Sequence, residues 1–233
     1  MVQTIFIVRH GLPRDPPLTV YGETQAQELA EYFVSLPEEQ RPSAIFSSPY
    51  YRCLQTAKPV AGALGVPIYV EHGLSEWYSP VVPGSGLHPR PASASSLRSW
   101  FSDIDPSWSS VFYPSRKGED VTAVHDRAAG VLETLVSEVR RRFPGEHERI
   151  LLISHAATII ALTRELLGDR DLPLRVGCCS VTHMVKKPEV KKILPGWEPV
   201  VEHPGEPGSE NEEDHPVGPQ VSVSEHEPIP ARM

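Results

Sequence analysis

The sequence has few cysteines and no long apolar run, and both features limit what the protein can be. Cys53, Cys178 and Cys179 are the only cysteines, too few for a disulfide framework, and no Cys/His pattern has the spacing of a zinc site. Every apolar run is shorter than the ~18 residues of a membrane-spanning helix. No basic leader opens the chain. We therefore expect a cytoplasmic or nuclear protein, or one present in both compartments, with no membrane contact.

Proline and acidic residues are concentrated at one end of the chain. The 233 residues include 25 prolines, about twice the usual ~5%. Residues 193–233 hold eight of these prolines, nine of the 30 acidic residues and one of the 22 basic residues, and so carry the whole formal net charge of −8. Their few apolar side chains cannot offset the entropy of ordering. We expect a domain over residues 1–192 followed by a disordered, acidic, Pro-rich tail over residues 193–233. The charge also argues against direct binding of nucleic acid.

Strand-like and helix-like segments alternate along the first 192 residues, which is typical of an α/β fold. Short apolar runs predict strands over residues 4–9, 44–47, 67–71, 150–154 and 179–185. Apolar spacings of three and four predict helices over residues 25–36, 50–64, 97–101, 119–143 and 157–167. We expect a three-layer α/β/α sandwich with a mostly parallel central sheet, and a long loop over residues 79–96.

Cationic and imidazole side chains lie where three of the predicted strands end. Arg9 and His10 are at the end of the first strand, Arg52 opens the helix after the second, and His155 follows the strand at 150–154. The carboxyl ends of parallel strands face the ligand crevice, so these side chains should meet there. Two guanidiniums and two imidazoles suit a tetrahedral phosphate. Taken singly, each has an ordinary alternative, with Arg52 a surface residue and His155 a capping or core histidine.

Such a site can carry out phosphoryl transfer if it also contains an acid. A neutral imidazole can attack phosphorus in line while cations stabilise the equatorial oxygens. Backbone N–H groups of the helix that opens near Ala156 can also hold an anion. Glu76 is the candidate acid, because the neighbouring Trp77 and Tyr78 are expected to raise its pKa enough for proton donation at neutral pH. The alternative for Glu76 is an ordinary loop residue.

Several of these motifs resemble the histidine phosphatase superfamily, the phosphoglycerate-mutase-like proteins. The similar segments are VRHG at residues 8–11, SSPYYRCLQTA at 47–57, the Glu76 segment and SHAATI at 154–159. The resemblance implies that His10 is the nucleophile, that Glu76 is the proton donor and that His155 is the second pocket histidine. It further implies that the phosphate ligands are Arg9, Arg52, His155 and Ala156.

The implied activity is that of a phosphomonoesterase of the histidine acid phosphatase type. It requires no metal and no cofactor, and its substrate is a phosphorylated small molecule or a phosphopeptide. A mutase is less favoured, because residues 79–96 offer only Arg90 as a cation for a doubly charged acid. The short segment between Gly11 and Leu18 implies a shallow, open pocket.

Longer segments give a narrower resemblance: SSPYYRCLQTAKPVA at 47–61, GVPIYVEHGLSEWY at 65–78, SHAATIIALTRELLG at 154–168 and CCSVTHM at 178–184 resemble the fungal branch of this superfamily. That branch includes a histidine-phosphatase-like subunit of the RNA polymerase III initiation factor. It implies an alternative function: a phosphatase-fold assembly subunit with transcription-factor subunits as partners and little or secondary catalysis. The tail has its own alternative, a passive solubilising extension.

Overall fold

One six-stranded sheet forms the centre of the computed structural model, which describes residues 1–13 and 17–200. Its strands are β1 (Thr4–Arg9), β2 (Ala44–Ser47), β3 (Ile68–Val70), β4 (Arg149–Ser154), β5 (Val181–Lys186) and β6 (Trp197–Pro199). They lie in the order β3-β2-β4-β1-β5-β6. The first four in this order pair in parallel, whereas β5 and β6 are antiparallel additions at one edge. The sheet is therefore mostly parallel, as the sequence predicted.

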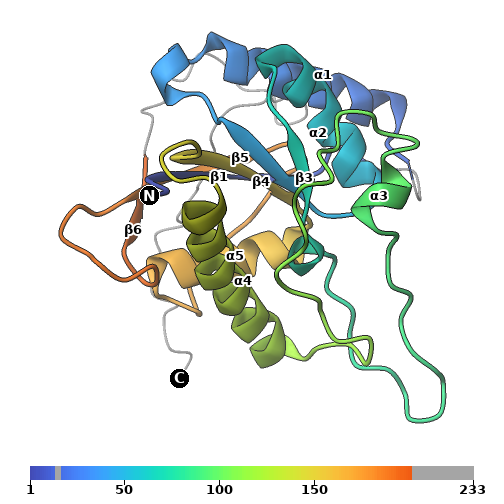
Figure 1. Cartoon of the computed structure of the whole chain (residues 1–233). Helices are drawn as coiled ribbons and strands as arrows, with labels where there is room; N and C mark the ends of the chain where they lie inside the picture. Colours follow the sequence, from blue (N-terminus) through green and yellow to red (C-terminus); the bar gives the residue numbers. More distant parts are fainter. Residues whose placement is uncertain (14–16, 201–233) are drawn as a thin grey trace, which may run out of the picture.

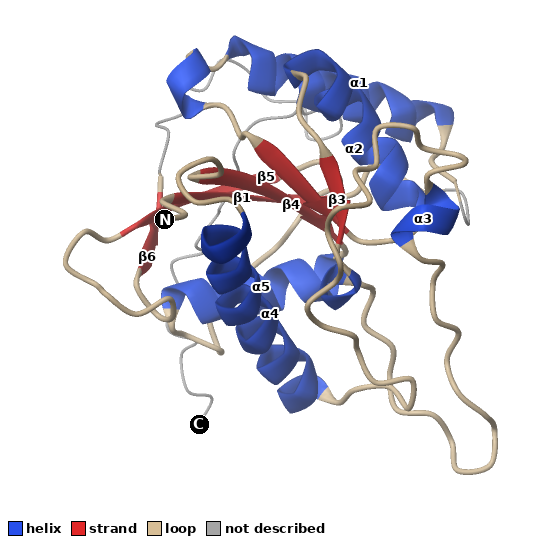
Figure 2. Ribbon diagram, viewed as in Figure 1, coloured by secondary structure: helices blue, strands red, loops and turns tan. Residues whose placement is uncertain are grey.

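Helices cover both faces of the sheet and complete the three layers (Figures 1 and 2). The α-helices are α1 (Val20–Ser35), α2 (Tyr51–Leu64), α3 (Ala94–Leu97), α4 (Val121–Arg142) and α5 (Ala156–Leu167). Two short 3-10 turns are η1 (Glu38–Gln40) and η2 (His72–Leu74). Helices α1 and α2 pack on one face and α4 and α5 on the other, so the predicted α/β/α sandwich is confirmed.

The strand β1 shows why the sheet is buried on both sides. Its side chains alternate between the two cores: Phe6 and Val8 pack on the α1–α2 side, and Ile5 and Ile7 on the α4–α5 side. All four are fully buried. A continuous apolar run is what a strand between two helical layers requires.

Helix boundaries follow local capping chemistry. Helix α1 begins at Val20, earlier than predicted, because the hydroxyl of Thr19 accepts a hydrogen bond from the N–H of Gly22. Helix α5 ends where Gly168 adopts a left-handed φ of 78°, as its glycine indicated. The predicted helix at residues 97–101 is instead the shorter α3 at Ala94–Leu97.

The predicted tail boundary at residue 193 is wrong, because residues 193–200 belong to the domain. Strand β6 pairs with β5, and the Trp197 ring is buried in the α4–α5 core. Its indole N–H donates to the carbonyl of Ile193 at 2.8 Å. The average composition of the last 41 residues concealed this local apolar cluster of Ile193, Leu194 and Trp197. Residues 201–233, the rest of the expected tail, lie outside the described residues.

The described helices also bear on membrane insertion. Within residues 1–13 and 17–200, no helix combines the length and the apolar character needed to cross a bilayer.

Candidate active site

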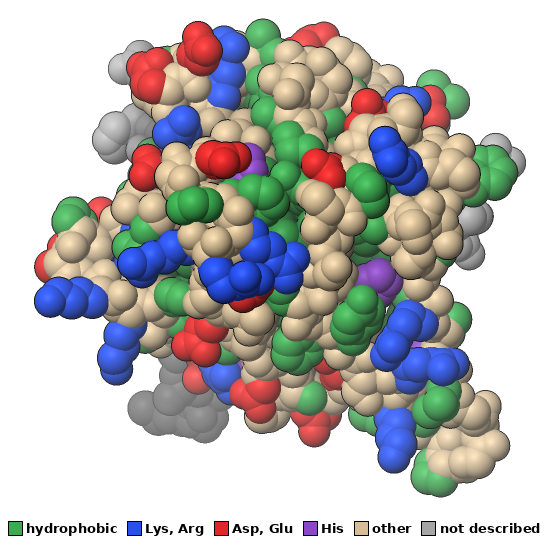
Figure 3. Space-filling model, in the orientation of Figure 1, with side chains coloured by type: hydrophobic (Ala, Val, Ile, Leu, Met, Phe, Trp, Pro, Cys, Tyr) green, Lys and Arg blue, Asp and Glu red, His purple; other side chains and the backbone are tan. Residues whose placement is uncertain are grey.

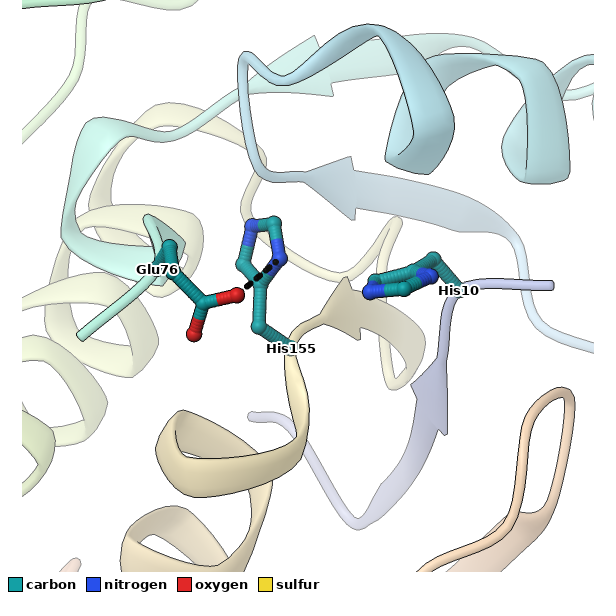
Figure 4. Close-up of side chains that lie close together, drawn as sticks. All are labelled: His10, Glu76 and His155. Carbon is teal, nitrogen blue, oxygen red and sulfur yellow. Dashed lines mark ion pairs between the residues drawn. The ribbon is translucent and has the colours of Figure 1, made fainter. Parts of the chain in front are cut away.

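Side chains from four separate parts of the chain meet beyond the carboxyl ends of the parallel strands. His10 follows β1, Arg52 lies in the first turn of α2 after β2, and His155 joins β4 to α5. Glu76 follows η2, which continues from β3. Figure 4 shows His10, Glu76 and His155 turned toward one another. The two imidazole rings lie edge to face with centroids 5.3 Å apart, and Arg52 contacts both, so three of the four side chains predicted to meet there do so.

The backbone around His10 is held by close packing and hydrogen bonds. The N–H of His10 donates to the carbonyl of Ser154 at 3.1 Å, and the N–H of Gly11 donates to the hydroxyl of Thr56 at 3.0 Å. Gly11 packs directly on the backbone of Gly22, where a Cβ on Gly11 would lie 2.6 Å from the Gly22 carbonyl oxygen. This contact leaves no room for any other residue at position 11 and fixes the His10 main chain against α1.

The His10 imidazole is held in one tautomer with one nitrogen facing the site. Its Nδ1 lies 2.7 Å from the carbonyl oxygen of Gly11, which can only accept, so Nδ1 carries the proton. Nε2 then has the free lone pair and accepts from Nε of Arg52 at 3.3 Å. Burial, with a smaller effect of the nearby cations, lowers the pKa of His10 to about 4. At neutral pH His10 is therefore an uncharged imidazole, as a nucleophile must be.

Arg52, Glu76 and His155 form a compact triangle beside His10. Nη2 of Arg52 lies 3.1 Å from Oε2 of Glu76 and 3.0 Å from Nδ1 of His155. The same Nδ1 lies 3.2 Å from Oε2 of Glu76. Burial lowers the pKa of His155 despite the nearby carboxylate, so this ring is also neutral at pH 7. The guanidinium of Arg52 is thus the full positive charge of the triangle.

The hydroxyl of Ser48 allows His155 to change its hydrogen bonds. It lies 2.8 Å from Nε2 of His155 and can either donate or accept there. When Nδ1 of His155 accepts from Arg52, Nε2–H donates to Ser48. When Nδ1 donates to Glu76, Ser48 donates to Nε2. Both tautomers of the buried ring are therefore satisfied, and Ser48 is a site residue that the sequence reasoning did not single out.

The structure corrects the expected ionisation state of Glu76. We predicted a raised pKa from Trp77 and Tyr78, and burial does act in that direction. The contact with His155, the N–H of Trp77 and the Arg52 cation outweigh it and lower the pKa of Glu76 to about 2. The free protein therefore holds Glu76 as a carboxylate, and any acid role requires a proton that arrives with the ligand.

Arg9 and Ala156 lie at the rim of this cluster. Nη1 of Arg9 donates to the carbonyl of Val176 at 3.0 Å, while its buried Nε has no hydrogen-bond partner among the residues the structure describes. Ala156 is the first residue of α5, so its N–H belongs to the turn that lacks intrahelical acceptors. The N–H of Ala156 adjoins His155 at a helix N-terminus, which can hold an anion, and the charge of Arg9 acts on His10.

The donor set could in principle suit a metal ion. One ligand atom each of His10, Glu76 and His155 lies within 4.8 Å of the others. The Arg52 guanidinium, however, touches all three side chains at 3.0–3.3 Å. A fixed cation in that position opposes a second cation and favours an anion. The arrangement therefore favours an anion over a metal ion, with the unprotonated Nε2 of His10 beside the guanidinium.

A buried ion pair that the sequence reasoning missed holds the Glu76 segment in place. The Arg127 side chain, on α4, is nearly fully buried, and its Nε donates to both carboxylate oxygens of Glu119 at 2.8 and 3.0 Å. Its Nη1 donates to the carbonyls of Gly73 and Ser75 at 2.7 and 3.0 Å. Thr158 of α5 donates to the same Ser75 carbonyl at 2.9 Å. Arg127 is thus a positioning residue for the segment that presents Glu76.

Glu71 fixes the other side of that segment. Its fully buried carboxylate accepts from the N–H groups of Gly73, Val111 and Phe112 and from the indole of Trp108, at 2.9–3.2 Å. It therefore ties the end of β3 to the loop that returns toward α4. The position of Glu71 directly after a predicted strand could have indicated a role for it, but the sequence does not show which four groups donate to its carboxylate.

Comparison with known proteins identifies a family and two sequence relatives. Residues 5–194 match the model of the histidine phosphatase superfamily (branch 1). The transcription factor tau 55 kDa subunit of Saccharomyces cerevisiae is 38% identical over 208 residues, which cover 78% of this chain and 47% of that protein. The human ubiquitin-associated and SH3 domain-containing protein A is 30% identical over 179 residues, covering 74% of this chain and 25% of that protein. The chain thus spans about half or less of these relatives.

Solved structures show the same fold. The ecdysone phosphate phosphatase from Bombix mori, in complex with tungstate, aligns with a TM-score of 0.64 at 18% identity, covering 91% of this chain and 98% of that chain. The native mycobacterial glucosyl-3-phosphoglycerate phosphatase aligns with a TM-score of 0.57 at 20% identity, covering 85% and 97%. At these identities the likeness concerns the fold, and the family model and the sequence relatives decide the membership. The chain belongs to the histidine phosphatase superfamily.

Proposed function

We propose that this chain is a phosphomonoester hydrolase that works through a phosphohistidine on His10. The observation that carries the proposal is the presentation of its Nε2, unprotonated and 3.3 Å from the Arg52 guanidinium, because Nδ1–H is held by the Gly11 carbonyl. Arg9, Arg52, His155 and the N–H of Ala156 supply the donors for the phosphoryl oxygens. Family membership and the phosphatase-fold neighbours support the same reaction class.

In the first step a phosphoryl group binds between the cations and meets Nε2 of His10. The lone pair of Nε2 forms the N–P bond while the P–O bond to the leaving group breaks. The leaving oxygen takes a proton from Glu76 and departs as an alcohol. The imidazolium that results keeps its Nδ1–H on the Gly11 carbonyl, which stabilises the positive charge.

The proton on Glu76 has to come from the substrate. Glu76 is ionised in the free protein, whereas a phosphate monoester with a second pKa near ~6 carries a proton in mildly acidic solution. The bound phosphoryl group draws Arg52 away from Glu76 and places negative charge beside the carboxylate, and both changes raise its pKa. The substrate monoanion can then transfer its proton to Glu76.

In the second step water hydrolyses the phosphohistidine. The Glu76 carboxylate removes a proton from the attacking water, whose oxygen forms a new bond to phosphorus. The N–P bond breaks, and its electron pair returns to Nε2 of His10. Glu76 passes the proton it took from water to the departing phosphate, which leaves as the monoanion, and the carboxylate is restored.

The rate should have an acidic optimum. We expect kcat/KM for an alkyl phosphate to fall as pH drops through about 4, where His10 gains a proton and loses its nucleophilic lone pair. It should also fall as pH rises through ~6, where the free substrate loses the proton that Glu76 needs. The measurement is a pH profile of kcat/KM at constant ionic strength.

The variant Glu76→Gln tests whether the fall of kcat/KM above pH ~6 depends on proton transfer through Glu76. Glutamine cannot accept and return a proton, so hydrolysis of alkyl phosphates should slow far more than the first step with an aryl phosphate, whose leaving group needs little protonation. A wild-type profile that stays level between pH 5 and pH 9 would contradict the assigned proton route.

The relation to the yeast subunit favours a second candidate function. At 38% identity over most of this chain, an assembly role in an RNA polymerase III initiation factor, with a nuclear location and secondary catalysis, is the alternative. Purification of a tagged chain separates the two. Recovery of transcription-factor subunits supports assembly, and hydrolysis of phosphate monoesters by a chain that brings down none of them supports a free phosphatase.

A further inference from the structure

Three hollows on the surface of this domain share walls and lead away from the candidate active site. The first, of about 400 Å³ including its open mouth, is lined by Glu76, Tyr50, Tyr78 and Arg90 among others. The second, of about 850 Å³, is also lined by Tyr50 and Arg90 and continues past Pro91 to Trp100. Their shared residues make them one passage that opens at Glu76.

The third hollow extends this passage along α2. It measures about 820 Å³ and shares Tyr51 and Trp100 with the second hollow. It continues over Gln55 and Lys58 of α2 toward Glu23 of α1. We call the second and third hollows together the Trp100 groove. It runs from Tyr50, where it meets the first hollow, across the junction of α2 and α3, which lie side by side (Figure 1).

The middle of the Trp100 groove is lined by flat aromatic and proline surfaces. The Trp100 ring is 71% exposed, although tryptophan is usually well buried, and its centroid lies 6.3 Å from that of Tyr51. Pro49, Pro89 and Pro91 line the same stretch. Rings and prolines of this kind bind extended peptide segments, because they offer large contact areas at a low cost in conformational entropy.

The charges beside the site match a phosphorylated ligand. Arg90, in the long loop, lines both the first hollow and the groove, and Arg116, in the segment before α4, joins it in the first hollow. Figure 3 shows Lys and Arg side chains gathered at the lower right of this face. Negative charge is therefore favoured near Glu76, and apolar contact is favoured farther along the groove.

We infer that the substrate is a phosphorylated peptide segment of another protein, with its phosphate at His10 and its neighbouring residues in the Trp100 groove. The inference rests on the proposed function. A small phosphorylated metabolite bound at His10 would leave the groove empty, and the groove continues past Trp100 over Gln55 and Lys58 toward Glu23. Tyr50, which lines the groove, also packs against His155 and Arg52, at 5.0 and 4.9 Å from its ring centroid, and this contact with the cluster is what assigns the occupant.

The experiment compares Trp100→Ala with the unchanged chain on two substrates. One is a capped phosphopeptide with proline and leucine beside the phosphorylated residue, made in phosphotyrosine and phosphoserine forms. The other is p-nitrophenyl phosphate, which cannot reach the groove. We expect the ratio of kcat/KM for the better peptide to that for p-nitrophenyl phosphate to fall roughly tenfold or more in Trp100→Ala. Tyr21→Ala, which removes an exposed ring on α1 outside the groove, is the matched control and should leave the ratio unchanged.

A binding measurement separates failure of the groove from failure of the chemistry. In a His10→Ala background, the Kd of the fluorescently labelled phosphopeptide should weaken roughly tenfold when Trp100 is also replaced. Hydrolysis of p-nitrophenyl phosphate with both the ratio and the Kd unaffected by Trp100→Ala overturns the groove and leaves the phosphatase standing. Peptide binding that depends on Trp100, without hydrolysis of any monoester, supports the groove and overturns the phosphatase.

Discussion

Replacing His10 by alanine should lower hydrolysis of p-nitrophenyl phosphate by roughly four orders of magnitude or more. The variant loses the atom that forms the bond to phosphorus, and no other free nitrogen lone pair lies in its place. His155 cannot substitute, because its ring is fully buried and both of its nitrogens contact Ser48, Arg52 or Glu76. Steady-state kinetics on purified protein gives the factor. Rapid quenching of the unchanged chain should trap an acid-labile phosphate adduct on His10.

A matched histidine variant controls for damage to the fold. His147 lies before β4, near Ser43 and Phe143, and so at the opposite end of the sheet from the site. His147→Ala should keep activity near that of the unchanged chain. If His10→Ala retained the wild-type rate while remaining folded, the phosphohistidine assignment would be wrong. An adduct on any other residue would have the same meaning.

Replacing Arg127 by methionine should cost about 3–5 kcal/mol of folding stability. The change removes the cation from the buried Glu119 carboxylate and two donors from the carbonyls of Gly73 and Ser75. A buried charge left without its partner is among the costliest defects that a domain can contain. Urea unfolding should show a lower midpoint with an unchanged slope. Activity should also fall, because the segment that presents Glu76 loses its anchor.

Two further variants test this explanation. Arg141→Met removes an exposed arginine of the same helix, paired there with Glu138, and should leave the urea midpoint almost unchanged. Adding Glu119→Gln to Arg127→Met removes the unpaired charge and should restore part of the lost stability. If Arg127→Met unfolded at the wild-type midpoint, the ion pair would not be what holds the segment.

The fold was largely predictable because its strands sit between two helical layers. Runs such as residues 4–9 and 150–154 are apolar throughout, and that pattern indicates burial on both faces. Strand β6 was missed for the opposite reason. It is three residues long and lies in acidic, proline-rich sequence, where only Trp197 marks the local core. Burial of one large ring outweighed the average composition around it.

The sequence predicted which side chains meet at the site, but it did not predict their pKa values. Strand ends locate His10, Arg52 and His155, because parallel strands deliver their carboxyl ends to one edge. The ionisation of Glu76 depends on contacts across the fold with His155 and Arg52, at 3.2 and 3.1 Å, which sequence neighbours do not show. The adjacent Trp77 and Tyr78 therefore led to the wrong direction of the pKa shift.

Arg127 carried a signal that was overlooked. It lies three residues after Val124 and four before Val131, both buried, and so falls within the apolar stripe of α4. A charged residue in such a stripe has to be buried with a partner. Its position therefore predicted a buried ion pair, although the sequence could not identify Glu119 as the partner.

The contact between Arg52 and Glu76 should make the site discriminate between anions. An anion that binds Nη2 of the guanidinium competes with a carboxylate of this chain, held at 3.1 Å. One ion pair is exchanged for another, so a singly charged solute such as chloride or acetate gains little. A phosphoryl group offers three oxygens and brings the proton that neutralises Glu76, so it still gains from the exchange. The Glu76 carboxylate thus competes with small monoanions for Arg52 and should weaken their binding to the site.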